Sequence, residues 1–340
     1  MEKESIKKLL YSFLKGKEYL NKTVISQNLS IIDEITEQTK EVKLIGVKNT
    51  SDIDRSLIKK LTASKNFFWH TIDKMSGNGR ALDTELINPL TGRSMTGSSS
   101  GTAINIFLGI NDLGIGTDGG GSVIYPAVSL NLYSFLGSGI GLKSEKMKKS
   151  TDGIDFSAGI GLISRDLETL YSAVTLLSNI KNEKISCRIA VLDNLEKDLK
   201  IKNIFDKSFI SNDFDSDDRM DIINKLSKIF SKYDLLVAKE EMIDFNSYGD
   251  SIIGNLGEKA KKSQLDSNKK LGKVLNMMNL SAITVPADEI SSAYIIIAKT
   301  GTDHIDTLFK TARILEHKEN PLIQKYFNSF LENKNIIFQL

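Results

Sequence analysis

Hydrophobic positions near the start of the chain recur at the three- and four-residue spacing of an amphipathic helix. Leu10, Phe13 and Leu14 fall on one face, and Gly16 follows as a stop signal. A second helical segment continues from there. The pattern therefore predicts N-terminal helices over residues 1–40.

Beyond this region, short apolar runs rich in β-branched and aromatic residues alternate with segments of helical periodicity. The predicted strands are 42–48, 66–72, 113–118, 279–287 and 293–301. The predicted helices are 52–64, 101–110 and 304–327. This alternation predicts an α/β fold in a single domain, with a mixed β-sheet core flanked by helices. Residues 42–190 would form the core, and residues 276–340 would complete it with the last strands and a helix.

Two stretches depart from this alternation. Residues 194–275 are rich in Lys, Asp, Asn and Ser and carry apolar positions at helical spacing. We expect a helical insertion that lies over the sheet and forms part of the substrate cleft, or alternatively a helical region that serves only stability. Residues 73–96 hold several glycines with little periodicity, which predicts a long loop, and such loops are often functional in compact domains.

Composition and charge exclude several classes of partner and site. The 45 basic and 43 acidic residues give a net charge of +2, so we expect neither a nucleic-acid nor a membrane partner. Cys187 is the single cysteine, which excludes a multi-thiolate metal site and indicates a reducing compartment. The N-terminus is charged from its second residue, and no apolar run approaches the length of a membrane span. We therefore expect a cytoplasmic protein without metal or cofactor.

Two clusters of serine and glycine stand out as candidate chemistry: "TGSSSGT" (96–102) and "GTDGGGSVIYP" (116–126). The row of backbone N–H groups from Gly119 to Ser122 can curl into an anion-binding nest, and such a nest beside a nucleophile serves as an oxyanion hole. The alternative is a flexible turn between strands. "GSSSG" formally matches a nucleophile elbow at Ser99, but no strand precedes it, so the pattern argues against that assignment.

Taken together, these motifs resemble the amidase signature family, in which a serine-rich loop precedes the nucleophile segment by 24 residues. The interval from Ser98 to Ser122 is also 24 residues. "LIGVKNT", "LINPLTGRSMTG", "SAGIGLISRDLETLYSAVTLL" and "MNLSAITVPA" match further family segments in the same order. Roughly three quarters of the chain is covered, and only residues 194–275 are unmatched. The resemblance implies the amidase signature fold over residues 1–340.

The resemblance also implies a role for each motif residue. Lys48 would be the base, Ser122 the nucleophile, and Ser98, after a cis peptide bond from Gly97, the proton relay. A serine hydroxyl needs such a base, and a lysine can serve only if burial and hydrogen bonds lower its pKa. The resemblance places the oxyanion hole at Gly119, Gly120 and Gly121. It gives supporting roles to Thr117 and Asp118, which brace the loop, and we expect Ser99 and Ser100 to cap the helix that follows.

The implied activity is a serine amidohydrolase that cleaves a carboxamide or related C–N bond and uses no cofactor. The alternatives are acyl transfer to an amine acceptor, as in an amidotransferase, and a catalytically impaired binding protein. Two departures from the family motivate the second alternative: Lys48 lies only 50 positions before Ser98, and Ile124 replaces an expected arginine. The short loops imply an open cleft for a small-molecule or acyl-amide substrate, or a cleft covered by a protein partner or a second copy in a homodimer.

Overall fold

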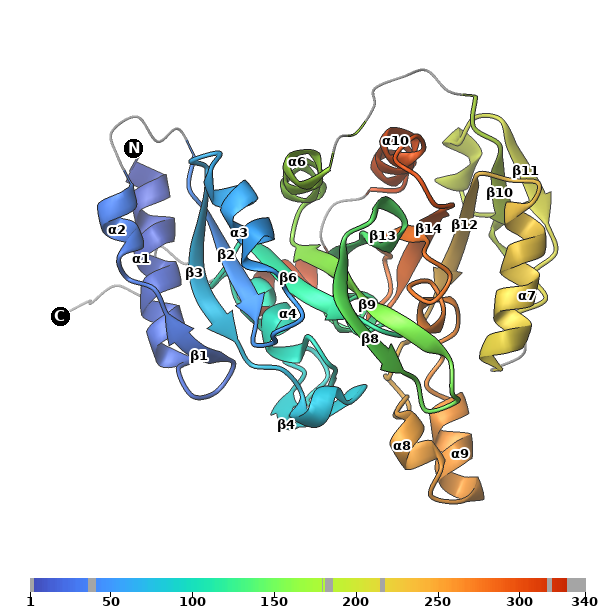
Figure 1. Cartoon of the computed structure of the whole chain (residues 1–340), viewed down its shortest axis with the longest axis horizontal. Helices are drawn as coiled ribbons and strands as arrows, with labels where there is room; N and C mark the ends of the chain where they lie inside the picture. Colours follow the sequence, from blue (N-terminus) through green and yellow to red (C-terminus); the bar gives the residue numbers. More distant parts are fainter. Residues whose placement is uncertain are drawn as a thin grey trace.

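The computed structural model describes residues 3–35, 41–178, 180, 186–214, 218–316 and 320–328. At its centre lies one mixed sheet of 12 strands with helices on both faces (Figure 1). The strands of this sheet are β1 (Val24–Gln27), β2 (Lys43–Lys48), β3 (Phe67–Asp73), β6 (Leu113–Asp118), β7 (Tyr133–Leu136), β8 (Lys143–Lys149), β9 (Asp155–Ser164), β10 (Ile189–Leu192), β11 (Lys207–Ile210), β12 (Leu235–Glu240), β13 (Ser281–Pro286) and β14 (Ala293–Ala298). The predicted α/β fold with a mixed, helix-flanked sheet is confirmed.

The order of strands across the sheet is β1-β3-β2-β6-β9-β7-β13-β14-β12-β10-β11, with β8 paired to β9. Strand β2 runs parallel to β6, with Val47 opposite Ile115, whereas β6 runs antiparallel to β9. Parallel neighbours end at the same edge of a sheet. Lys48 at the end of β2 and Thr117 near the end of β6 are therefore brought to one edge by strand register alone.

Helices cover both faces of the sheet because most strands place apolar side chains on both faces. One face is covered by α3 (Arg55–Thr62), α6 (Leu167–Leu177) and α10 (Ile305–Leu315), and the other by α4 (Ser100–Phe107), α5 (Ile124–Val128) and α7 (Arg219–Phe230). On β9, Leu162 packs against the core under α3, α6 and α10, whereas the next residue, Ile163, packs against the core under α4. Burial on both faces explains why central strands such as β14 are nearly continuous apolar runs.

Two glycines of β6 allow α4 to lie directly on the strand. A Cβ atom at Gly116 would lie 2.6 Å from Oγ of Ser99, and one at Gly114 would lie 2.5 Å from Cγ2 of Thr102. Real Cβ atoms do not approach neighbours so closely. The "LGIGTD" pattern thus seats the N-terminus of α4, and the serine cluster before it, against the strand that leads to the second cluster.

The prediction of helices alone over residues 1–40 is wrong. Helix α1 (Lys3–Glu18) runs two residues past Gly16, and the short α2 (Ile31–Glu34) follows, but strand β1 lies between them. The first residue of β1, Val24, is buried, and the strand pairs antiparallel with β3. A two-residue β-branched run at a sheet edge is too short to show its period in sequence. Residues 36–40 of the predicted second helix lie outside the described residues.

The prediction of a helical insertion over residues 194–275 is also corrected. The region contains α7, α8 (Ser251–Gly254) and α9 (Glu258–Leu265), but it also supplies strands β11 and β12 to the main sheet. The run "LLVA" in β12 continues the apolar pattern of α7, and periodicity cannot assign so short a run. The region is therefore part of the core as well as of the cleft.

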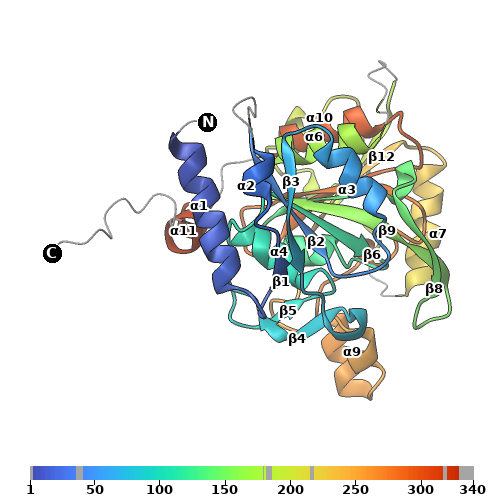
Figure 2. The same ribbon diagram turned by 60° about the vertical axis from the view of Figure 1, so that its left-hand side comes forward.

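Residues 73–96 were expected to form a long loop, and much of this segment is instead a small hairpin. It consists of β4 (Leu82–Ile87) and β5 (Ser94–Thr96), which pair antiparallel in a separate two-stranded sheet. Figures 1 and 2 show this hairpin at the same end of the molecule as α9. The predicted terminal strands are confirmed as β13 and β14, and the last predicted helix divides into α10 and α11 (Pro321–Ile323), which is followed by a single π-helical turn.

Among the helices of the described ranges, none combines the length and the apolar character that crossing a bilayer requires. The same residues contain no group of three or more His, Cys, Asp or Glu side chains arranged to hold a metal ion.

Candidate active site

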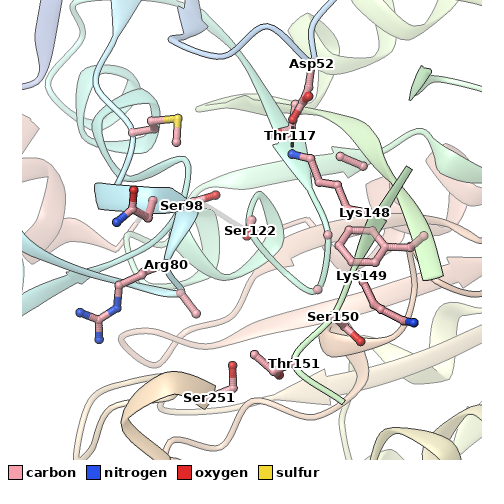
Figure 3. A pocket seen from close by; sticks show the side chains of 18 of the residues that line it. Asp52, Arg80, Ser98, Thr117, Ser122, Lys148, Lys149, Ser150, Thr151 and Ser251 are labelled. Carbon is pink, nitrogen blue, oxygen red and sulfur yellow. Dashed lines mark hydrogen bonds and ion pairs between the residues drawn. The ribbon is translucent and has the colours of Figure 1, made fainter. Parts of the chain in front are cut away.

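A cavity of about 350 Å³ opens at the sheet edge where β2 and β6 end (Figure 3). This volume falls within the range of small-molecule sites. Its wall includes six of the residues singled out in the sequence: Lys48, Ser98, Thr117, Gly119, Gly120 and Ser122. Side chains separated by more than 70 positions in the chain therefore meet in one concave space.

Lys48 is buried at the end of β2, with 3% of its surface exposed. Its Nζ lies 2.6 Å from Oγ of Ser98, and 3.0 and 3.3 Å from the hydroxyl and carbonyl oxygens of Thr117. Burial lowers the pKa of Lys48 to about 7, although Asp118 and Asp52 act in the opposite direction. A substantial fraction of the amine is therefore neutral near pH 7.

The contacts of Lys48 suit a neutral amine. Such an amine has two N–H donors and one lone pair, and the carbonyl of Thr117 can only accept. In the ammonium form, Nζ donates to all three oxygens. In the neutral form, its two N–H groups can donate to the oxygens of Thr117, which leaves the lone pair to accept from the hydroxyl of Ser98. This arrangement allows Ser98 to donate its proton to Lys48.

Ser98 is held by backbone contacts on both sides. The Gly97–Ser98 peptide bond is cis, as the resemblance implied. The N–H of Gly97 donates to the carbonyl of Ala81 at 2.9 Å, and the carbonyl of Ser98 accepts from Ser76 at 3.1 Å. A Cβ atom at Gly97 would collide with the carbonyl of Arg80, so glycine is required there. The hairpin segment thus fixes the serine loop against Lys48.

Asp118 shapes the turn that presents Ser122. Its carboxylate is fully buried and accepts hydrogen bonds from the N–H groups of Gly121 and Val123, both at 2.7 Å, and from Ile124 at 3.3 Å. Burial raises the pKa of Asp118, and these three N–H donors oppose that rise. Gly121 has a φ of +96°, a conformation that favours glycine. Asp118 therefore braces the loop, as predicted.

One of the three predicted oxyanion donors is not available. The N–H of Gly121 is directed to Asp118, so the prediction for Gly121 is wrong. The N–H groups of Gly119, Gly120 and Ser122 have no acceptor within the described part of the chain, and all three residues line the cavity. The donor on Ser122 itself was missed, because the sequence does not reveal which N–H groups the Asp118 carboxylate consumes.

The similarity of this chain to known proteins lies in its fold rather than in its sequence. No protein-family model and no curated protein matches the chain. Among solved structures, a crystal structure described as an amidase superposes with a TM-score of 0.64 at 12% identity, covering 91% of this chain and 94% of that one. A 6-aminohexanoate cyclic dimer hydrolase complexed with substrate gives 0.62 at 14% identity, covering 90% and 92%. One of the subunits of glutamyl-tRNA(Gln) amidotransferase from Thermotoga maritima gives 0.60 at 15% identity, covering 92% of each chain.

The chain has the amidase signature fold. These neighbours match it over nearly their whole lengths. Within this fold, Ile124 takes the position at which the family resemblance implies an arginine. Its side chain is fully buried and packs into the core between α5 and the sheet. Its N–H still donates to Asp118, so the isoleucine is compatible with the turn that presents Ser122.

The serine cluster before α4 differs from its expected capping role. Ser99 occupies the N-cap position, but its hydroxyl makes no capping hydrogen bond and has no partner within the described ranges. Its N–H donates to the carbonyl of Ser122 at 3.1 Å and so ties the two loops together. The hydroxyl of Ser100 donates to Asp83. Ser99 is fully buried and is not among the residues that line the cavity, which contradicts the elbow assignment.

Several charged residues of the cavity wall were not predicted from the sequence. Figure 3 shows Arg80, Lys148 and Lys149 around the two serines. Lys148 forms an ion pair with Asp52, and Arg80 forms one with Asp250. The sequence "EKMKK" of β8 resembles an ordinary solvated face, so nothing in it indicates that its last residues border an amidase-fold cavity.

Proposed function

We propose that the chain is a serine amidohydrolase that cleaves a carboxamide or a related C–N bond in a small-molecule or acyl-amide substrate. One observation carries the proposal: the buried amine of Lys48 lies 2.6 Å from the Ser98 hydroxyl, in the cavity that also contains Ser122. A lysine buried without a carboxylate partner is a poor structural element and a good base near neutral pH.

In the acylation step, Oγ of Ser122 attacks the amide carbonyl carbon. The proton of Ser122 passes to Ser98, whose own proton passes to the neutral amine of Lys48. The carbonyl oxygen becomes an oxyanion and is held by the unpaired N–H groups of Gly119, Gly120 and Ser122. The C–N bond then breaks, and the leaving amine takes a proton from Ser98, which recovers one from the protonated Lys48. An acyl ester remains on Ser122, and Lys48 is neutral again.

In the deacylation step, water repeats the attack on the ester. Lys48 again accepts a proton through Ser98, and the same N–H groups hold the second oxyanion. Collapse releases the carboxylic acid and returns the proton to Ser122. No other group is needed to balance the reaction, because the amide and water supply all the atoms of the two products.

Transfer of the acyl group to an amine is the second candidate function. The similarity to one component of an amidotransferase favours it, since the same acyl ester could be captured by an amine instead of water. Hydroxylamine distinguishes the two. Formation of hydroxamate at the expense of acid indicates transfer, whereas acid release unaffected by the acceptor indicates hydrolysis.

A fluorophosphonate probe tests the nucleophile directly. We expect one covalent adduct on Ser122 by peptide mass mapping, lost in Ser122→Ala and formed much more slowly in Lys48→Met. Ser56→Ala is the matched control, because Ser56 is an exposed serine in the first turn of α3. An adduct elsewhere, or a rate unchanged in Lys48→Met, would contradict the proposal.

A further inference from the structure

Arg219 contributes a guanidinium group to the active-site cavity. It is the first residue of α7, which is anchored in the core through the buried Ile222 and Leu226. Arg219 lines the active-site cavity and two adjoining cavities, the smaller of which, about 40 Å³, also contacts Ser122. Its Nη2 lies 3.7 Å from the position that a Cβ atom would take on Gly120. The guanidinium therefore lies directly beside the candidate oxyanion hole.

The hydrogen-bonding capacity of Arg219 is only partly used. A guanidinium carries five N–H donors in a planar fork. Nη1 is paired with Asp152, while Nε is buried and has no partner in the part of the chain that the structure describes. Such a fork matches the two oxygens of a carboxylate.

Three basic side chains of the cavity wall are each paired with an aspartate: Lys148 with Asp52, Arg80 with Asp250, and Arg219 with Asp152. The side chains of Asp52 and Asp250 are 6% and 1% exposed, so releasing their partners would leave a buried charge unpaired. The side chain of Asp152, in the turn between β8 and β9, is 42% exposed. Water can solvate it, so this pair is the easiest of the three to exchange.

We propose that Arg219 binds a carboxylate on the acyl part of the substrate, and that this carboxylate displaces Asp152. The inference rests on the proposed function and names its substrate class. Because Arg219 lies beside Gly120, the acidic group must be only a few bonds from the scissile carbonyl. The preferred substrates are therefore monoamides of short dicarboxylic acids.

The test compares kcat/KM for ammonia release from succinic and glutaric monoamides with that for neutral amides of equal chain length. In Arg219→Met we expect the acidic-to-neutral selectivity to fall by about 10²-fold, the usual effect of removing one partner of a hydrogen-bonded charge pair. Arg219→Lys restores part of it. Asp152→Asn raises kcat/KM for the acidic amides several-fold, because the competing carboxylate is gone.

Arg313→Met is the matched control. Arg313 lies on α10, which does not line the cavity, and it pairs with the exposed Glu168. The variant should leave selectivity unchanged. Equal losses for acidic and neutral amides in Arg219→Met would overturn the inference. So would loss of selectivity in Lys149→Met with retention in Arg219→Met, because Lys149 also lines the cavity.

Binding separates this inference from the proposed function. Calorimetry with glutarate on the Ser122→Ala variant needs no turnover. We expect binding that weakens at least about tenfold when Arg219→Met is added, consistent with loss of a charge-assisted bidentate contact. Glutarate binding independent of Arg219 overturns the inference even if amide hydrolysis is confirmed. Arg219-dependent binding without labelling of Ser122 supports it while the hydrolase proposal fails.

Discussion

Two lysines, Lys48 and Lys269, are buried in walls of cavities that also contain Ser122, and each is 3% exposed. Their neighbours differ. Nζ of Lys48 contacts two hydroxyl groups and one carbonyl group. Nζ of Lys269 forms an ion pair with Asp244 at 2.6 Å, donates to the carbonyl of Gly249 at 3.1 Å and lies 5.4 Å from the centre of the Tyr125 ring.

The difference shows that the presence of a carboxylate, rather than burial alone, decides what a buried lysine does. Asp244 supplies the charge that a buried ammonium requires, and it also accepts a hydrogen bond from Thr96 on β5. Lys269 thereby ties the end of the 194–275 region to the hairpin. Lys48 forms no ion pair with a carboxylate of the described residues, and burial lowers its pKa to about 7, as the proposed role of base requires.

The largest expected effect comes from removing the lysine that lacks a carboxylate. In Lys48→Met we expect amide turnover to fall by about 10³-fold or more, near the upper range for loss of a general base. The free energy of unfolding should not decrease, since methionine fills the site without leaving a buried charge. Steady-state kinetics and urea denaturation measure both. Substantial turnover in this variant would remove Lys48 from the mechanism.

The second prediction concerns Lys269, whose replacement should lower stability rather than turnover. Lys269→Met leaves Asp244 buried and unpaired, so we expect a loss of about 3–5 kcal/mol in the free energy of unfolding. Urea denaturation measures it. The double variant Lys269→Met with Asp244→Asn should recover most of the loss, because no charge is then buried and asparagine tolerates the φ of +52° at this position. If the double variant is as unstable as the single one, the loss of stability comes from altered packing rather than from the unpaired charge.

The sequence predicted the lysine and the two serine loops of the cavity better than the rest of the cavity wall, and the reason is local. Glycine turns and the 24-residue interval between Ser98 and Ser122 depend on short-range backbone geometry that the residues themselves specify. Lys48 was identified as the last residue of an apolar strand, and the strand register then brings it to the same edge as Thr117. The loss of Gly121 as a donor depends on the position of one carboxylate, which no sequence pattern encodes.

The charged wall could not be predicted because it depends on tertiary structure. Arg219 follows an aspartate N-cap at the start of an ordinary amphipathic helix, and its reach into the cavity depends on where α7 packs. Similarly, β12 was missed because a four-residue apolar run fits a buried strand and a helix equally well. The sequence thus predicted the fold class and the two serine loops that line the cavity, but not the charged residues of the cavity wall.

The third prediction concerns pH and follows from the lowered pKa of Lys48. Protonated Lys48 cannot accept the proton of Ser98, so kcat/KM for a neutral amide should rise about tenfold per pH unit below about pH 7 and level off above it. A neutral substrate keeps the profile free of substrate ionisation. A profile that is flat between pH 5 and 7 would show that another group is the base.

The same ionisation affects stability with a definite sign. In the unfolded chain the pKa of Lys48 lies near its ordinary value of 10.5, so between about pH 7 and 10.5 the unfolded state binds more protons than the folded state. Stability of the wild type relative to Lys48→Met should therefore rise with pH in this window, by up to about 1.4 kcal/mol per unit. Denaturation at pH 7, 8 and 9 measures this slope. If the difference in stability between the two proteins does not change with pH, Lys48 stays charged in the folded state.

The smallest effect concerns how Thr117 tunes Lys48. Thr117→Val removes the hydroxyl at 3.0 Å from Nζ and keeps the carbonyl contact. A hydrogen bond stabilises the ammonium form about 1 kcal/mol more than the neutral amine, because bonds to charged groups are stronger. The variant should therefore shift the kcat/KM profile to lower pH by roughly half a unit to one unit, with a several-fold loss of kcat. Thr117→Ser retains the oxygen and should leave the midpoint in place; a shift toward higher pH in the valine variant would mean that the hydroxyl donates to a neutral Lys48 instead of accepting from it.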